Sequence, residues 1–454
     1  MHRFLVSAAN KSSGKTTLSV GLAAALRRRG LALQTFKKGP DYIDPLWLAL
    51  ASARPCRNLD FYVSSREEIA VAYARHGAAA DVCLVEGNKG LYDGLDLDGS
   101  SSNAALAKFL ELPVVLVIDA RGMTRGIAPL ILGYQAFDPQ VRFAGVILNR
   151  LGGSRHEAKL RAVIEHYTGV AVLGAVHDDP ALGIFERHLG LVPANEAETA
   201  TASIEAIGTA IDRQVDIVRL LERTKAAAPP LPAAQPKATR ASPDIRIGVA
   251  RDRAFGFYYA GDLEALEAAG AALVAFDTLH DARLPEVDAL FIGGGFPECF
   301  AGALQANASL RAEIRRRAAA GMPMYAECGG LMYLARSITW KGERHEMVGA
   351  IAADVVMRER PTGRGYVRME ANAGHPWGLE AGTAIRAHEF HYSSLEGLDA
   401  GTRYAYRVQR GHGIDGERDG IVVGNVLASY THLRAAGACD WPRRFVDFVR
   451  KSRA

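Results

Sequence analysis

The stretch that organises this sequence is Tyr-Ala-Glu-Cys-Gly-Gly-Leu-Met-Tyr-Leu, at residues 325–334. An apolar run ending at Tyr325 predicts a buried strand, and Leu331 begins a predicted helix. Between them lies one thiol, Cys328, followed directly by two glycines, the small residues that a sharp strand-to-helix turn requires. The following helix would point its amides at the sulfur and favour the thiolate, which is the attacking form. A buried core cysteine is the alternative, but this order of elements favours Cys328 as a nucleophile.

A cysteine nucleophile needs a base and a site for the developing oxyanion close to it in space. His432 follows an apolar run beginning at Val426 and is the candidate base, with a capping or surface histidine as the alternative. A glycine turn follows the apolar run at residues 289–292, and its amides suit an oxyanion hole. The residues expected there are Gly294, Gly295 and Gly329. Two further histidines at residues 387–393 have no third partner at a metal-like spacing, so a structural or substrate-lining strand is expected.

The N-terminal end carries a phosphate-binding loop in the order strand, loop, helix. The loop is Ser-Ala-Ala-Asn-Lys-Ser-Ser-Gly-Lys-Thr-Thr at residues 7–17, with an apolar run before it and a helical pattern after it. Loop amides cradle phosphates, Lys15 reaches the terminal phosphates and the Thr16 hydroxyl binds Mg²⁺. Ala9 replaces the first motif glycine, and a serine-rich turn is the alternative. The expected nucleotide-binding residues are Ser13, Gly14, Lys15, Thr16 and Thr17.

Acidic residues follow other predicted strands, where α/β sheets place their ligands. Asp41 and Asp44 come after the strand at residues 32–37, and Glu86 ends the strand at residues 81–86. Carboxylates with a hydroxyl suit Mg²⁺, so Thr16, Asp41 and Glu86 are the expected metal ligands. A turn-rich loop adds Asp93. Asn149 ends another strand and either reads a nucleobase or serves as a turn residue.

The composition describes a globular chain of two domains. Of 454 residues, 49% are hydrophobic and 23% are charged, and the net charge of +4 is too small and dispersed to indicate nucleic-acid binding. Five widely spaced cysteines, and no apolar run of membrane-spanning length, favour the cytoplasm. Strands alternating with helices predict an α/β fold with parallel sheets. The expected parts are a nucleotide-binding domain (1–222, closed by one helix at 203–221), an Ala/Pro-rich linker (223–244) and a second domain (245–450).

Taken together, these motifs resemble the cobyrinic acid a,c-diamide synthase family over essentially the whole chain. That family joins a P-loop synthetase domain, similar to dethiobiotin synthetase, to a class I glutamine amidotransferase domain with a flavodoxin-like fold. The matching stretches are residues 13–17, 38–45, 186–191, 293–298, 326–334, 388–393 and 424–430.

The resemblance implies an amidoligase with two sites, using ATP, Mg²⁺ and glutamine. Cys328, assisted by His432, would release ammonia from glutamine through a thioester. ATP would convert a peripheral acetate of a tetrapyrrole into an acyl phosphate, which ammonia would displace. The family's magnesium and carboxylate-activating acids carry over to Asp41, Asp44, Glu86 and Asp93. The resemblance leaves the oligomeric state open, with a homodimer as one alternative.

Two departures from the family pattern bear on mechanism and substrate. Arg434 lies two residues after His432, where class I amidotransferases commonly have a glutamate, so the third triad member is unidentified. Asn88 and Lys89 stand where corrin-making members usually have apolar residues. With residues 121–126, they look like the branch that amidates sirohaem. The other readings are a P-loop partitioning switch, and a catalytically inactive scaffold in place of the amidotransferase domain.

Overall fold

The computed structural model describes residues 1–454 except 185, 188–189, 197–198, 227–241 and 454. The chain divides into two compact units, Met1–Gln235 and Pro236–Ala454. Most of the predicted linker lies outside the described residues, so the boundaries at 222 and 245 stay predictions. No helix among the described residues is long and apolar enough to cross a membrane.

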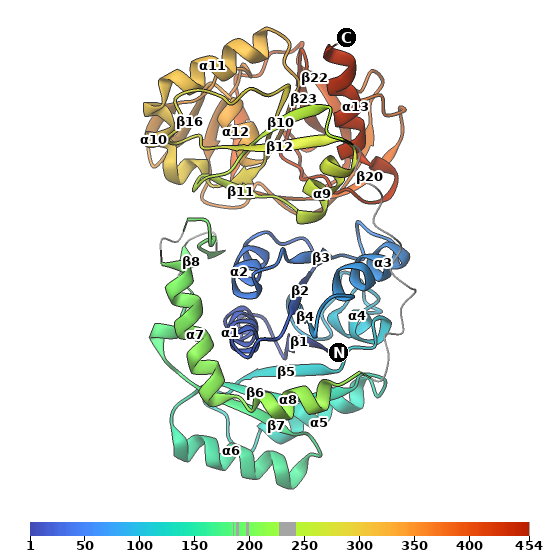
Figure 1. Cartoon of the computed structure of the whole chain (residues 1–454), viewed down its shortest axis with the longest axis vertical. Coiled ribbons are helices and arrows are strands. Elements are labelled where there is room, and N and C mark those ends of the chain that lie inside the picture. The colour runs from blue at the N-terminus through green and yellow to red at the C-terminus, as the bar shows by residue number, and fades with distance from the viewer. Residues whose placement is uncertain (185, 188–189, 197–198, 227–241, 454) are drawn as a thin grey trace. The chain divides into compact units, whose positions relative to one another are not determined.

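The first unit is built on one parallel sheet of seven strands in the order β3-β2-β4-β1-β5-β6-β7 (Figure 1). The strands are β1 (His2–Ala8), β2 (Leu33–Lys38), β3 (Arg57–Leu59), β4 (Val82–Glu86), β5 (Val114–Asp119), β6 (Phe143–Leu151) and β7 (Val172–His177). The helices are α1 (Lys15–Arg28), α2 (Ile43–Ser52), α3 (Arg66–Gly77), α4 (Asn103–Phe109), α5 (Ile127–Phe137), α6 (Ser154–Tyr167), α7 (Ala200–Gln214) and α8 (Ile217–Thr224). A short hairpin joins β8 (Glu186–Arg187) and β9 (Gly190–Leu191).

Helices cover both faces of this sheet, which is why its strands are continuous apolar runs. Successive residues of a strand point to opposite faces. In β1, Phe4 and Val6 therefore pack into one core cluster with α1, α2, α7 and α8, while Leu5 packs into another with α3 to α6. The predicted α/β class is confirmed for this unit.

The second unit is built on a nine-stranded mixed sheet in the order β12-β10-β13-β15-β24-β23-β22-β19-β20. Its parallel half holds β10 (Ile245–Ala250), β12 (Ala271–Phe276), β13 (Ala289–Ile292), β15 (Met324–Glu327) and β24 (Val426–Ser429). Its antiparallel half adds β19 (Gly363–Ala371), β20 (Ala384–His391), β22 (Arg403–Arg410) and β23 (Arg418–Val423).

Smaller elements complete the second unit. The pair β11 (Phe255–Phe257) and β14 (Gly294–Gly295) is antiparallel. A four-stranded sheet joins β16 (Ser337–Trp340), β17 (Glu343–Glu346), β18 (Asp354–Met357) and β21 (Ser393–Glu396). The helices are α9 (Ala260–Ala268), α10 (Ala301–Ala306), α11 (Ala308–Ala319), α12 (Gly329–Leu334) and α13 (Trp441–Arg453).

The prediction of a single helix at residues 203–221 is wrong, because the helix is interrupted at Val215 between α7 and α8. Val215 forms an isolated antiparallel bridge with Gly174 of β7. Asp216 then caps α8, its carboxylate accepting a hydrogen bond from the Arg219 amide at 2.9 Å. Asp at an N-cap stabilises a new helix start. Two helices therefore close this part of the unit.

The helix that follows the phosphate-binding loop is held by a close helix–helix contact. A Cβ built on Gly21 of α1 would lie 2.4 Å from Ile211 Cγ1 and 2.9 Å from Ile207 Cγ2 of α7. On the other helix, a Cβ on Gly208 would lie 2.7 Å from the Ala24 Cβ. Only glycines allow this approach, so α7 fixes α1 and with it the loop.

We expect Gly21→Ala to destabilise the chain by about 1–3 kcal/mol, because the added methyl group overpacks the contact with α7. Denaturant unfolding measures this change. The matched control is Gly133→Ala in α5, where no atom of the described residues lies within 4 Å of the new Cβ. There the free energy of unfolding should rise by about 0.4–1 kcal/mol. Equal effects of the two substitutions would contradict the close α1–α7 packing.

Candidate functional site

The first candidate site lies where β2, β4 and β1 end side by side. Parallel pairing sets Val6 of β1 and Lys37 of β2 on either side of Glu86 of β4. The loop after β1 therefore opens beside the acidic end of β4 and the lysines of β2. This is the edge where the predicted phosphate, metal and carboxylate groups were expected to meet.

The loop before α1 has a strained backbone that neighbouring side chains support. Ser12 and Gly14 both have positive φ, 64° and 85°, and Gly14 precedes Lys15, the first residue of α1. The Asn149 amide donates to the Ser13 carbonyl at 2.9 Å, and a Cβ on Gly14 would lie 2.3 Å from that amide nitrogen. The Asn149 amide group therefore already donates a hydrogen bond to the loop. Recognition of a nucleobase by Asn149 stays a prediction.

Lys37 sits at the centre of the predicted acids. Its Nζ is 2.5 Å from Asp44 Oδ2, 2.8 Å from Glu86 Oε1 and 3.8 Å from Asp41 Oδ2. The Thr16 hydroxyl donates to Glu86 at 3.0 Å and to Asp44 at 3.2 Å. One buried ammonium and one hydroxyl therefore gather three of the four acids predicted for this site.

Burial and charge set the pKa values of this cluster. Burial raises the pKa of Glu86 to about 7, and burial together with the Asp44 charge raises that of Asp41 to about 7. Burial opposes ionisation of Asp44 as well, but the charge and hydrogen bond of Lys37 outweigh it and lower its pKa. Burial, and then the Lys37 charge, lower the pKa of Lys15 to about 8. Glu86, Asp41 and Lys15 therefore have pKa values close to neutral pH. Binding of a cation or a phosphate nearby would change their protonation.

The donors at this edge fit a magnesium nucleotide. Glu86 Oε2 is buried and has no hydrogen-bond partner within the described part of the chain, so it is available to a cation or its water shell. Among the described residues, no group of three or more His, Cys, Asp or Glu side chains is arranged to hold a metal. Mg²⁺ typically binds one or two carboxylates and takes its remaining oxygens from phosphates and water. Thr16 and Glu86, with one more acid, match that requirement.

The loop after β4 carries Asp93 and the unusual Asn88-Lys89 pair. Asp93 accepts a hydrogen bond from the Gly90 amide at 2.8 Å, and its charge acts on Lys15. Lys38 Nζ donates to Asn88 Oδ1 at 3.1 Å. Lys89 has a positive φ of 34°, rare for a residue with a side chain. Burial lowers the pKa of Lys38 to about 8 against the opposing charge of Asp60. The loop thus brings the charge of Asp93 to act on Lys15 and the Asn88 side chain to Lys38 of β2.

The second candidate site lies where β13, β15 and β24 end side by side. Glu327 of β15 pairs in register with Ser429 of β24, so the residues after both strands are neighbours. Cys328 follows with φ 48° and ψ −103°, and its amide donates to the Ser429 carbonyl at 2.7 Å. α12 begins at the next residue. The predicted strained strand-to-helix turn is present at Cys328.

His432 lies against Cys328, with which it shares a hydrogen bond. Its Nδ1 is 3.3 Å from Glu327 Oε2, and its backbone bridges to His388 of β20. Burial alone lowers the pKa of His432, but hydrogen bonds and charges of Cys328 and Glu327 outweigh it and raise the pKa to about 10. The geometry is that of a thiol with an adjacent, oriented base.

The glycine turn after β13 packs directly onto this pair. A Cβ on Gly294 would lie 2.7 Å from His432 Cε1, and a Cβ on Gly329 would lie 3.0 Å from the Gly295 amide nitrogen. A Cβ on Gly330 would approach the Ile292 carbonyl oxygen to 2.1 Å. Side chains are therefore excluded from the turn, and its backbone packs against His432 and the glycines that follow Cys328. An oxyanion hole of Gly294, Gly295 and Gly329 stays a prediction.

The two further histidines predicted at residues 387–393 are His388 and His391, and both lie on β20. His391 stacks on Tyr430 at 3.8 Å between ring centroids, and its Nδ1 is 2.9 Å from the Ser393 carbonyl. The Phe390 carbonyl accepts a hydrogen bond from Cys328 Sγ at 3.7 Å, so this strand lines the thiol. Arg434, two residues after His432, lies over the Tyr259 ring, with its guanidinium 3.8 Å from the ring centroid.

The sequence interpretation missed the roles of two residues. Lys37 was noted only as one of two lysines at the end of the predicted strand at residues 32–37. Glu327 was noted only as a motif residue between Cys328 and the predicted strand that ends at Tyr325. Each is a charged residue within or ending a buried strand, and that is the signal that could have identified it. The predicted motif at residues 186–191 also included His188 and the Arg187 side chain, which both lie outside the described part of the structure.

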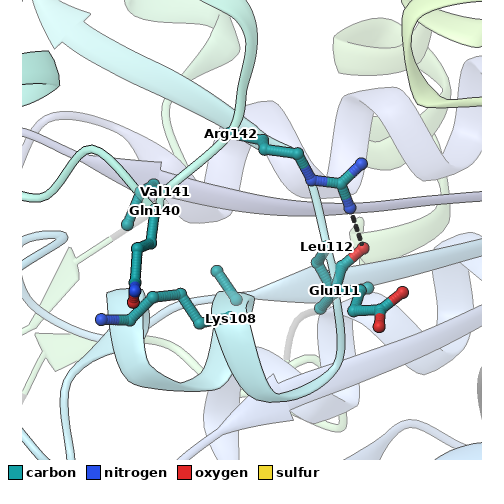
Figure 2. Close-up of a pocket in the computed structure, with 7 residues that line it drawn as sticks. Lys108, Glu111, Leu112, Gln140, Val141 and Arg142 are labelled. Atoms are coloured by element: carbon teal, nitrogen blue, oxygen red, sulfur yellow. Dashed lines mark hydrogen bonds between the residues drawn. The ribbon is translucent and has the colours of Figure 1, made fainter.

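A separate pocket of about 330 Å³ lies at the amino ends of β5 and β6, not at the edge that holds Lys15 (Figure 2). Lys108 in its wall pairs with Asp138 at 2.6 Å, and Arg142 donates to the Glu111 carbonyl at 2.8 Å. Its two cations are thus already engaged within the chain, and the pocket has no part in the sites above.

Comparison with known proteins gives one consistent result. Residues 5–191 match the CobQ/CobB/MinD/ParA nucleotide binding domain, and residues 246–438 match the CobB/CobQ-like glutamine amidotransferase domain. The cobyrinate a,c-diamide synthase of Magnetococcus marinus is 44% identical, over 99% of this chain and 97% of its own length. The cobyrinate a,c-diamide synthase of Methanosarcina acetivorans is 42% identical, over 100% of this chain and 96% of its own length. That of Syntrophotalea carbinolica is also 42% identical, over 99% of this chain and 98% of its own length.

We expect the affinity for ATP to fall as the pH rises from about 7 to about 9, because Lys15 loses its charge with a pKa of about 8. The loss should approach tenfold for each pH unit above that pKa. Equilibrium binding at constant ionic strength measures it. Lys108→Gln, which alters the separate pocket, should leave the slope unchanged. A pH-independent affinity in the unmodified chain would contradict this assignment.

Proposed function

This chain belongs to the cobyrinate a,c-diamide synthase family, and from that premise we propose that it amidates the a and c acetate carboxylates of a tetrapyrrole, using ATP and glutamine. The observation that carries the proposal is that one chain holds both a thiol with an oriented base and a phosphate-binding loop beside acids and lysines. The first arrangement suits release of ammonia from an amide. The second suits activation of a carboxylate.

In the glutamine reaction, Cys328 loses its proton to His432 and attacks the side-chain amide carbon. A tetrahedral intermediate forms, with its oxyanion held by the amides of the 293–295 turn and Gly329. His432 then returns the proton to the leaving nitrogen, which departs as ammonia and leaves a glutamyl thioester. Water hydrolyses the thioester and restores the thiol.

In the synthetase reaction, the acetate oxygen attacks the terminal phosphorus of ATP, and ADP leaves. Lys15 and the loop amides hold the phosphates, while Lys37 and the acids Asp41, Asp44 and Asp93 position the reacting carboxylate. Mg²⁺, held by Thr16 and Glu86 with one more acid, would neutralise charge on the transferring phosphate. Ammonia displaces phosphate from the acyl carbon, giving the amide. Activation is needed because a carboxylate oxygen is a poor leaving group until it carries phosphate.

Cobyrinate is the proposed tetrapyrrole, since the relatives named above are all cobyrinate a,c-diamide synthases. Sirohaem stays the alternative substrate because of the Asn88-Lys89 loop, in which Asn88 accepts a hydrogen bond from Lys38, the residue after Lys37. A partitioning switch is disfavoured, because such a protein would have no use for Cys328 and His432. Homodimer assembly and cytoplasmic location stay predictions.

We expect Cys328→Ala to abolish glutamine-dependent amidation while keeping amidation with free ammonia, because the synthetase site is untouched. Glu86→Ala should lose both, since no acyl phosphate forms. Product mass, with glutamine or ammonium as nitrogen donor, measures each rate. Equal loss with both donors in the Cys328 variant would contradict two separate sites. An unaffected glutamine-dependent rate would instead favour an inactive scaffold.

We expect parallel assays with cobyrinate and sirohaem to give a product only from cobyrinate, with one amide gained per converted acetate. Lys89→Leu should then change the KM for the tetrapyrrole more than the KM for ATP, because Lys89 lies in the loop between Glu86 and Asp93 and has no predicted phosphate role. Conversion of sirohaem alone would overturn the substrate assignment and make residues 88–89 the leading specificity element.

A further inference from the structure

The carboxylate next to the nucleophile has two differently engaged oxygens. Glu327 is the last residue of β15 and only 3% exposed. Its Oε1 accepts hydrogen bonds from the Tyr325 hydroxyl at 2.5 Å and the Leu433 amide at 2.8 Å. Its Oε2 lies 3.3 Å from His432 Nδ1. One oxygen is thus fixed by the fold, and the other meets the base.

Burial of the Glu327 carboxylate is unfavourable in free energy, and its contact with His432 accounts for a charged residue at this position. Burying a carboxylate is unfavourable unless it is paired and hydrogen-bonded. A neutral side chain could serve Tyr325 and Leu433, because both only donate hydrogen bonds. A negative charge is useful at Oε2, where the ring becomes cationic during proton transfer.

We propose that Glu327 is the positioning residue of the amidotransferase site, accepting the Nδ1 proton of His432 so that Nε2 faces the Cys328 thiol. This inference rests on the proposed glutamine reaction. Glu327 transfers no proton itself. The proton moves from Cys328 to Nε2 of His432 and then to the departing ammonia, while Glu327 holds the tautomer and stabilises the imidazolium.

The position two residues after His432 cannot fill this role. Arg434 has the wrong charge, and its Nε lies 3.9 Å from the buried Asp262. Asp262 in turn accepts hydrogen bonds from the Ala435 amide at 2.9 Å and the Trp441 indole at 3.2 Å. Arg434 therefore anchors the chain after His432, and the orienting acid comes instead from the residue before the nucleophile.

The groups that face His432 allow a pH test. They are Cys328 and Glu327 from the turn after β15, and His388 from the neighbouring strand. Burial, and then the His432 charge, lower the pKa of His388 to about 3, so His388 is neutral throughout the working range. Burial works against charging His432, and Cys328 and Glu327 are the groups that favour its charged form. Removing the Glu327 charge must therefore lower the pKa of His432.

The experiment compares Glu327→Gln, Glu327→Asp and Tyr325→Phe in the full chain with a Cys299→Ser background, because Cys299 is the exposed cysteine of the five. Three readouts are taken: kcat and KM for glutamine across pH, amidation with free ammonia, and the rate of Cys328 alkylation by iodoacetamide. Tyr325→Phe is the matched control, because it removes a hydrogen bond at Oε1 and leaves the Oε2–Nδ1 contact in place.

Glu327→Gln should lower kcat for glutamine by about 10²–10⁴-fold, with KM little changed, because the wrong tautomer is favoured and Glu327 touches no substrate. Its alkaline limit of activity should shift to lower pH, and alkylation of Cys328 should slow. Glu327→Asp should restore part of each effect. Tyr325→Phe should lose about fivefold at most. Amidation with ammonia should persist in every variant.

An unchanged pH profile and rate in Glu327→Gln would overturn the proposal. So would equal loss of glutamine- and ammonia-dependent amidation in both Glu327 variants, because that pattern would make Glu327 a general structural residue. A parent chain unable to hydrolyse glutamine would contradict the proposed function instead. The alkylation rates would then still report on the Glu327–His432 contact.

Discussion

The constraint on which both units depend is the parallel pairing of neighbouring strands, which brings their carboxyl ends to one edge. In the first unit, the ends of β1, β4 and β2 supply the phosphate-binding loop, Glu86 and the lysines. In the second unit, the ends of β13, β15 and β24 supply the glycine turn, Cys328 and the segment leading to His432. Residues far apart in sequence become neighbours because their strands are neighbours.

Both units also use the same electrostatic device. A glutamate ends an otherwise apolar buried strand, Glu86 in β4 and Glu327 in β15, and each faces a basic side chain from another element. Lys37 compensates the first carboxylate, and His432 meets the second. Burial strengthens these interactions because little water competes with them. The fold thus holds charge in place before any substrate arrives.

The sequence predicted the reactive residues better than it predicted which side chains contact them. The strand–loop–helix patterns around Lys15 and Cys328 are local, and the structure reproduces both. Lys37 contacts Asp44 and Glu86 because β2 lies next to β4 in the sheet, and no local sequence pattern reveals that strand order. The role of Glu327 was missed because the predicted strand ended at Tyr325 and the orienting acid was sought two residues after His432. The break at Val215 depends on a bridge to β7, so helical periodicity alone could not show it.

In the proposed reaction, the first unit activates a carboxylate as an acyl phosphate, and the second unit supplies the ammonia that displaces the phosphate. The most direct test is turnover of a tetrapyrrole whose acetate oxygens carry a heavy oxygen isotope, with the released phosphate analysed by mass. One labelled oxygen should appear in phosphate for each amide formed. Unlabelled phosphate accompanying amide formation would contradict the account.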